Sequence, residues 1–179
     1  MAHPGAGVGG LVLDSGVLME WFICSYENRT EAEWPNTRFN LHFLRSPGDL
    51  RRWEGALRRY PGKLYMSAYS IAEVQRHVRD AEKECYNKQD FRQGCWRTIQ
   101  EVLQRFPVHE HHISWTALDE GLLHDHGPAD ASIVTITRQL MRQGHRPCIV
   151  RLDGPLRGRC RRLDLAAQHP DELVQPELA

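Results

Sequence analysis

The feature that most constrains the fold is an alternation of short apolar runs with longer stretches of helical periodicity. Two of these runs, Leu11–Leu13 and Pro147–Leu152, are followed directly by an aspartate. Short apolar runs bounded by turn residues are typical of buried strands. Strands that alternate with helices predict an α/β fold with a mainly parallel sheet. Because ligands bind beyond the carboxyl ends of such strands, we expect Asp14 and Asp153 at the functional edge.

The other expected elements follow from the same periodicity and from cap and turn residues. Ser67 and Ser114 are expected to cap helices, Pro128 to lie in the first turn of one, and Gly144 to end that helix. Residues 124–128 are expected to form a loop. Further strands are expected at 63–66, 108–113 and 162–165, and helices at 16–22, 49–59, 68–78, 89–105, 114–123 and 128–142.

The length of 179 residues fits one globular domain, and the 41% of apolar residues is enough for a core. We expect a flexible N-terminal tail over 1–8, a single domain over 9–175, and helical insertions around 26–61 and 82–107. Lysines and arginines number 23, as do the acids, so net charge does not point to nucleic acid. A neutral chain can still carry a local basic patch.

The five cysteines contain no C-x-x-C pair, which favours reduced thiols over a disulfide framework or a zinc site. The apolar runs are too short to cross a bilayer, and the N-terminus lacks the pattern of a signal peptide. We therefore expect a cytoplasmic protein without a membrane span.

Four acids stand beside apolar residues, where an unpaired carboxylate would be costly: Asp14, Glu73, Asp130 and Asp153. A divalent cation would offset several of these charges at once, and hard oxygen ligands suit Mg²⁺ or Mn²⁺. Taken singly, each acid also has an ordinary structural explanation: a helix cap, a solvated helix position, the helix dipole or an Asp-Gly turn. Their joint arrangement is what favours a metal site.

That arrangement resembles the PIN-domain nuclease family, including the VapC-like toxins of toxin–antitoxin pairs. Four features occur in the family's order. They are an opening strand with a first acid, a serine followed six residues later by a helix glutamate, the start of a helix with a third acid, and a later strand with a fourth acid. These segments are Leu11–Ser15, Ser67–Val74, Gly127–Val134 and Ile149–Asp153.

The resemblance implies a three-layer α/β/α fold with a central, mainly parallel sheet and helical elaborations. It implies an endoribonuclease that hydrolyses RNA phosphodiester bonds with one or two Mg²⁺ or Mn²⁺ ions. Asp14, Glu73 and Asp130 would be the main ligands. Asp153 would be a supporting ligand or would position the attacking water, and Ser15 would be a hydrogen-bond partner of the cluster. An antitoxin protein and a homodimer are further partners that the family implies. The chain departs from the family at Arg151, where a threonine or serine is common.

Basic and histidine-rich segments supply candidates for RNA contact around these acids. Arginines can bind the phosphate backbone, although a solvated surface run explains them equally well. The segment His109–His112 could ligate zinc or nickel, but an exposed surface is the favoured interpretation. Tryptophans such as Trp115 could stack on bases, but their spacing favours core or interface positions. The candidate RNA contacts are Arg151, Arg157, Arg159, His124 and His126.

Two alternative functions stay open at this point. The first is a catalytically weak, PIN-like module that binds RNA or a protein, which Arg151 and the long insertions favour. The second is an unrelated α/β hydrolase that uses the same carboxylates on a small phosphate ester. The Gly5–Gly10 segment matches G-x-G-x-x-G, but it precedes the first strand, so a dinucleotide site lacks its required context.

Overall fold

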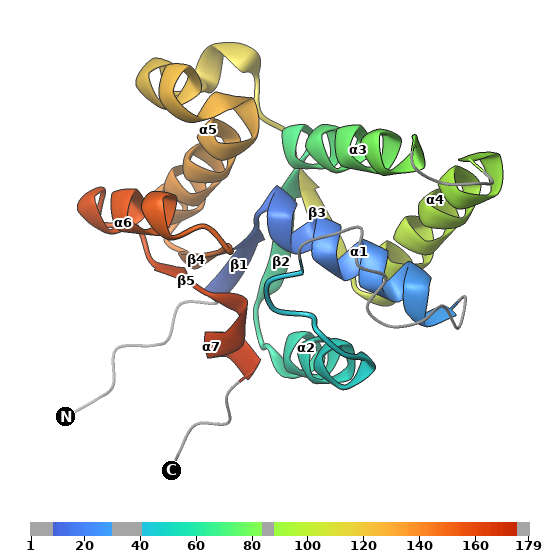
Figure 1. Cartoon of the computed structure of the whole chain (residues 1–179). Coiled ribbons are helices and arrows are strands. Elements are labelled where there is room, and N and C mark those ends of the chain that lie inside the picture. Colours follow the sequence, from blue (N-terminus) through green and yellow to red (C-terminus); the bar gives the residue numbers. More distant parts are fainter. Residues whose placement is uncertain (1–8, 30–40, 84–87, 175–179) are drawn as a thin grey trace.

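The computed structural model of the chain describes residues 9–29, 41–83 and 88–174 (Figure 1). The expected tail over 1–8 and parts of both expected insertions lie outside the described residues. Five parallel strands form one sheet in the order β3-β2-β1-β4-β5. Their bounds are β1 Gly9–Leu13, β2 Lys63–Ser67, β3 Val108–His111, β4 Arg146–Val150 and β5 Ala167–Gln168.

Strand β1 lies at the centre of the sheet and pairs with β2 on one side and with β4 on the other. Leu11 is opposite Leu64 in β2 and opposite Cys148 in β4. The amide of Asp14 donates to the carbonyl of Val150 at 3.0 Å, just beyond the last paired residues. The first acid therefore lies at the carboxyl edge of the sheet, as expected for a residue that directly follows a parallel strand.

Helices cover both faces of this sheet, which confirms the three-layer α/β/α architecture. Leu11 and Leu13 face a core shared with α1, α2, α3 and α4, whereas Val12 faces a core shared with α5 and α6. This alternation follows from the two-residue period of a strand. The helices are α1 Ser15–Arg29, α2 Pro47–Arg59, α3 Ala68–Glu82, α4 Lys88–Arg105, the 3-10 helix η1 Trp115–Ala117, α5 Glu120–Arg142, α6 Gly154–Arg162 and α7 Pro170–Val174.

The stretch between β3 and β4 differs from the expectation. Residues 124–128, expected to be a loop, belong to α5, and Ser114 makes no side-chain cap to the short η1. Asp119 caps α5 instead, because its Oδ1 accepts a hydrogen bond from the amide of Leu122 at 3.0 Å. Gly127, with φ of 82°, divides α5 into two segments, and Pro128 begins the second.

The expected strand at 162–165 is also wrong. Helix α6 begins at Gly154, with Asp153 as its N-cap residue, and continues to Arg162; the last strand follows only at Ala167. Leu165 is buried without pairing, since it packs in the core on the Val12 face of the sheet. An apolar residue in that position marks burial but does not distinguish a strand from a turn against the core.

Cys24, Cys148 and Cys160 have free thiols, while Cys85 lies outside the described residues. Within the described ranges, every helix is too short or too polar to cross a membrane.

Candidate active site

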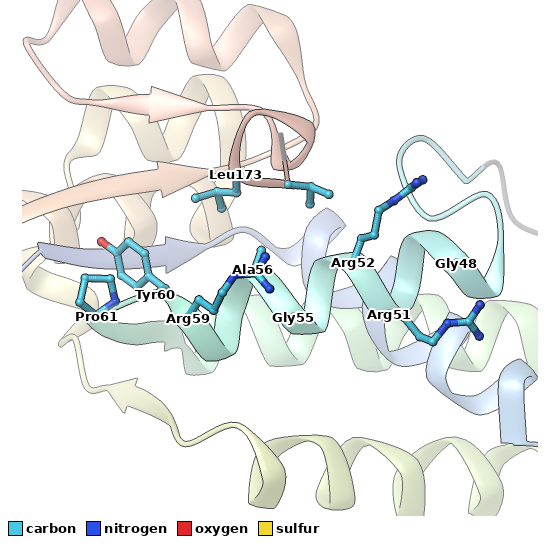
Figure 2. A pocket seen from close by; sticks show the side chains of 10 residues that line it. Gly48, Arg51, Arg52, Gly55, Ala56, Arg59, Tyr60, Pro61 and Leu173 are labelled. Atoms are coloured by element: carbon cyan, nitrogen blue, oxygen red, sulfur yellow. The ribbon is translucent and has the colours of Figure 1, made fainter. Parts of the chain in front are cut away.

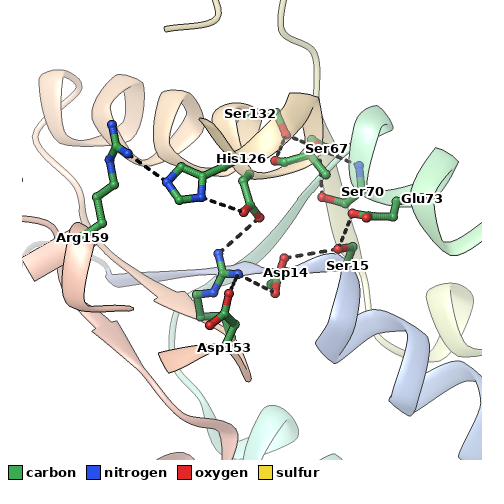
Figure 3. Close-up of polar contacts among 12 residues, drawn as sticks. Asp14, Ser15, Ser67, Ser70, Glu73, His126, Ser132, Asp153 and Arg159 are labelled. Atoms are coloured by element: carbon green, nitrogen blue, oxygen red, sulfur yellow. Dashed lines mark hydrogen bonds and ion pairs between the residues drawn. The ribbon is translucent and has the colours of Figure 1, made fainter. Parts of the chain in front are cut away.

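The four predicted acids come from four different segments and line one pocket of about 520 Å³ at the carboxyl edge of the sheet. Figure 3 labels three of them, Asp14, Glu73 and Asp153. Asp14 follows β1, and Asp153 follows β4 at the start of α6. Glu73 lies in the second turn of α3, and Asp130 follows the Gly127 kink of α5 by three residues. The chain thus brings together side chains that are as many as 139 positions apart (14 to 153) in the sequence.

Arg151 lies in the middle of three of these acids. One guanidinium nitrogen, Nη1, lies 3.3 Å from Oδ1 of Asp130, and the other, Nη2, lies 3.3 Å from Oδ2 of Asp153 and 3.8 Å from Oδ2 of Asp14 (Figure 3). Only 4% of the Arg151 side chain is exposed, and its buried Nε has no hydrogen-bond partner among the residues that the structure describes. The guanidinium therefore faces the protein's own carboxylates, and contact of Arg151 with RNA stays a prediction.

Glu73 has different partners from the three aspartates. The hydroxyl of Ser15 lies 2.7 Å from Oε2 of Glu73 and 3.3 Å from Oδ1 of Asp14. Since a hydroxyl has one proton to donate, the shorter contact makes Glu73 its main acceptor. Arg76, one turn further along α3, donates to Oε1 of Glu73 at 3.2 Å. Ser15 thereby connects the Glu73 side of the pocket to Asp14.

Burial and mutual repulsion disfavour the charged forms of the central acids. Burial raises the pKa of Asp130 to about 6, and the charges of Asp14, Glu73 and Asp153 act in the same direction, whereas Arg151 opposes the rise. Burial, with the charge of Glu73, also raises the pKa of Asp14 against the effect of Arg151. The guanidinium therefore does not fully offset the cost of burying these carboxylates.

The donor set fits a hard divalent cation in chemical type, since it consists of carboxylate oxygens with excess negative charge. In the structure, however, the three aspartates are arranged around the guanidinium of Arg151. Among the described residues, no three histidine, cysteine, aspartate or glutamate side chains are arranged to hold a metal ion as they stand. Metal binding at this edge would thus require carboxylate side chains to turn toward the cation.

Three buried serines fix the helices that carry Glu73 and Asp130. Ser67 caps α3 by accepting a hydrogen bond from the amide of Ser70 at 2.9 Å, and its hydroxyl also contacts that of Ser70 at 3.0 Å. The same hydroxyl lies 2.7 Å from the hydroxyl of Ser132 in α5. All three serines are fully buried, and their hydroxyl contacts join β2, α3 and α5. The sequence indicated only the Ser67 cap, because the contact with Ser132 spans 65 residues.

The candidate RNA contacts divide into those at the pocket and those outside it. His126 lines the pocket, with Nδ1 4.0 Å from Oδ2 of Asp130, and Arg159 reaches its Nε2 at 2.9 Å. His124 is 88% exposed and contacts Asp125. Arg157 pairs with Glu172 of α7 at 3.5 Å. His126 and Arg159 therefore lie nearest to the acids.

Other histidines have positions that the sequence did not predict. His42 and His77 line the pocket, and His42 is held by the fully buried Glu20, which accepts from both its amide and its ring. His109 and His111 both pack against the ring of Tyr65, so the two side chains lie on one face of β3. His111 contacts Gln139 at 2.8 Å, so its ring faces α5.

An exposed aromatic side chain lies at the same edge of the sheet. Trp115, just beyond β3, is 56% exposed and lies beside Tyr69, with ring centroids 6.1 Å apart. Tyr69 is one helical turn before Glu73 on α3. The sequence favoured a core or interface position for this tryptophan; its exposure rules out the core, and an interface position stays a prediction.

Comparison with known proteins adds no family to these observations. No protein-family model matches the sequence, and no curated protein matches it.

Proposed function

We propose that the protein is a metal-dependent endoribonuclease of the PIN type, which hydrolyses RNA phosphodiester bonds. The observation that carries the proposal is the meeting of Asp14, Glu73, Asp130 and Asp153 in one pocket at the carboxyl edge of a parallel sheet. Raised pKa values of Asp14 and Asp130 support a functional site, because shifts caused by burial and like charges are concentrated where chemistry occurs. The PIN resemblance of the four sequence segments points in the same direction.

In this proposal each side chain has a defined task. Asp14, Glu73 and Asp130 would hold Mg²⁺ or Mn²⁺, which supplies a Lewis acid that offsets the charge developing on a phosphate. Ser15 orients Glu73 and Asp14 through its hydroxyl. Arg151 holds Asp153 in place and limits the repulsion among the aspartates. His126, beside Asp130, lies where it can contact a phosphate group.

The choice of RNA over a small phosphate ester rests on the surroundings of the pocket. Trp115 is exposed at the edge that carries the acids, and an accessible aromatic ring can stack on a base of a single strand. A small ester would make no use of such a ring. A panel of small phosphoesters, compared with structured and single-stranded RNA, separates the two substrate classes.

The proposal is tested by replacing one metal-binding aspartate with asparagine, which has nearly the same shape but no charge. Asp130→Asn and Asp14→Asn should each lower Mn²⁺-dependent cleavage of labelled single-stranded RNA at least about 100-fold, as expected for lost electrostatic stabilisation. Asp125→Asn is the matched control, because this aspartate lies on the same helix but pairs with Arg159 outside the acid cluster. Full cleavage by both folded variants would refute the proposal.

A catalytically weak RNA- or protein-binding module is the second candidate, and the Arg151 ion pairs are the observation that favours it. A buried guanidinium can take over the charge-balancing task of a metal ion. This alternative expects RNA affinity that is the same in EDTA and in Mn²⁺, with no turnover in either. The antitoxin partner, the homodimer and the cytoplasmic location stay predictions of the resemblance and of the composition.

A further inference from the structure

We propose that Arg151 is a resident cation that restricts this pocket to one divalent metal ion. The guanidinium takes the place of a second ion among Asp14, Asp130 and Asp153, and the remaining ion binds on the Glu73 side. The inference deepens the proposed function and rests on one part of it, namely that a divalent ion binds at these acids. It addresses the number of ions, which the sequence left open.

The contacts of Arg151 divide the carboxylate oxygens into two sets. The guanidinium faces Oδ2 of Asp14, Oδ1 of Asp130 and Oδ2 of Asp153. The second oxygen of Asp14 and the Oε2 of Glu73 instead face the hydroxyl of Ser15 (Figure 3). The second oxygen of Asp130 points toward His126, 4.0 Å away. One oxygen from each of Asp14, Glu73 and Asp130 is thus directed away from the guanidinium.

A pair of ions that share carboxylates lie about 3.5–4 Å apart, so each needs its own set of oxygens. Arg151 already contacts the oxygens that a second ion would need, and Asp153 faces the guanidinium rather than Glu73. The two Nη atoms of Arg151 together contact all three aspartates. A second metal ion would have to offset the charges of the same three carboxylates. Only the Glu73 side is left for a metal ion.

Arg151 is held in this position by its backbone as well as by its charge. Its amide donates to the carbonyl of Gln168 at 3.1 Å, which attaches it to β5. Its side chain is 4% exposed, and an arginine does not lose its proton in proteins. Moving the guanidinium aside would uncover three carboxylates and require a new partner for a buried charge. A second ion therefore does not displace it readily.

Counting bound Mn²⁺ tests the inference without relying on cleavage. Titration calorimetry and electron paramagnetic resonance of the full chain with Mn²⁺ alone should show one ion per wild-type chain, without the broadening of a coupled ion pair. Arg151→Ser, which removes the guanidinium, should bind two ions and show that broadening. Arg151→Lys keeps a cation in the position and should bind one.

Arg157→Ser is the matched control, because this arginine lies six residues away and pairs with Glu172 instead of the aspartates. It should bind one ion, as the wild type does. Two ions in the wild type, or an unchanged count in a folded Arg151→Ser variant, would overturn the inference. The wild-type count keeps the test decisive if Arg151→Ser does not fold.

The failure of this inference is distinguishable from that of the proposed function. One bound Mn²⁺ with no RNA cleavage supports the assignment of Arg151 and contradicts the nuclease. Cleavage with two bound ions supports the nuclease and contradicts the assignment. The absence of Mn²⁺ binding in the wild type contradicts both.

Discussion

Arginines occupy two opposite settings in this molecule, one at each edge of the sheet. Arg151 at the carboxyl edge is buried among three aspartates, whereas Arg51, Arg52 and Arg59 are exposed along α2. The α2 arginines line a groove of about 990 Å³ between α2 and α7, next to Tyr60 and Pro61 before β2 (Figure 2). The same charge therefore lies in a dry cluster at one edge and in water at the other.

The difference shows how burial decides the importance of a charge. Arg52 is 67% exposed and pairs with Asp49 one turn away on the same helix, an interaction that water screens strongly. The guanidinium of Arg151 is shielded from water. Its positive charge stabilises the three carboxylates, whose mutual repulsion is poorly screened by solvent there. Perturbing the first setting should have small effects, and perturbing the second should have large ones.

Removal of Arg151 should produce the largest effect. We expect Arg151→Ala to lower the free energy of unfolding of the metal-free protein by about 3 kcal/mol, because the three carboxylates lose their buried counter-charge. Urea unfolding in EDTA measures this loss. Added Mn²⁺ should recover part of it in this variant. Stability equal to wild type in EDTA would show that the ion pairs contribute nothing.

Removal of the exposed aromatic ring should show which edge binds RNA. We expect Trp115→Ala to weaken binding of single-stranded RNA about tenfold in EDTA, as is typical for the loss of one base-stacking platform. Trp115→Phe should retain most of the affinity. Fluorescence anisotropy with labelled RNA provides the measurement. If Arg51→Ala and Arg59→Ala weaken binding more than Trp115→Ala does, then the α2 groove is the RNA surface.

The raised pKa of Asp130 predicts a gain in stability on substitution, whereas removal of Arg151 is expected to cause a loss. Its pKa is about 6 in the folded protein, against the ordinary aspartate value of 3.8 for the unfolded chain. Because the folded pKa is higher, the stability from this group is fully present below 3.8 and is lost as the pH rises through 6. Asp130→Asn, which is permanently neutral, should therefore stabilise the metal-free protein at pH 7 by about 1 kcal/mol.

Melting curves in EDTA at pH 5 and pH 7 measure this effect. The gain from Asp130→Asn should be smaller at pH 5, where the wild-type carboxyl is mostly protonated. Asp125→Asn is the control, because the pKa of Asp125 is shifted the other way: hydrogen bonds from Arg159 and His124 lower it. A destabilised Asp130→Asn at pH 7 would show that its ion pair with Arg151 outweighs its burial.

The α2 arginines should give the smallest change. We expect Arg59→Ala to alter the free energy of unfolding by less than about 0.5 kcal/mol, as is usual for exposed positions. Thermal melts at low and high salt check this value. A loss as large as that for Arg151→Ala would remove the contrast between the two edges.

Much of the fold could be predicted because the relevant signals are local. The strands around 11–13, 63–66 and 147–150 and the Ser67 helix cap were readable from apolar period and turn residues. Errors arose where a local signal has two interpretations. Residues 124–126 extend the first segment of α5, and the helix is interrupted only at Gly127, where φ is positive. Leu165 is buried just after a turn. Neither outcome has a distinct sequence pattern.

For the candidate site, the sequence by itself determined which acids lie at the carboxyl ends of strands and helix starts, since strand polarity places them at one edge. It also determined that Arg151 is unusual there. Only the tertiary structure decided that Arg151 points inward, with Asp14, Asp130 and Asp153 around it. The physical reason is that the direction of a side chain near a strand end depends on the charges that distant segments bring to it. Here those segments bring three carboxylates within ion-pair distance of the guanidinium.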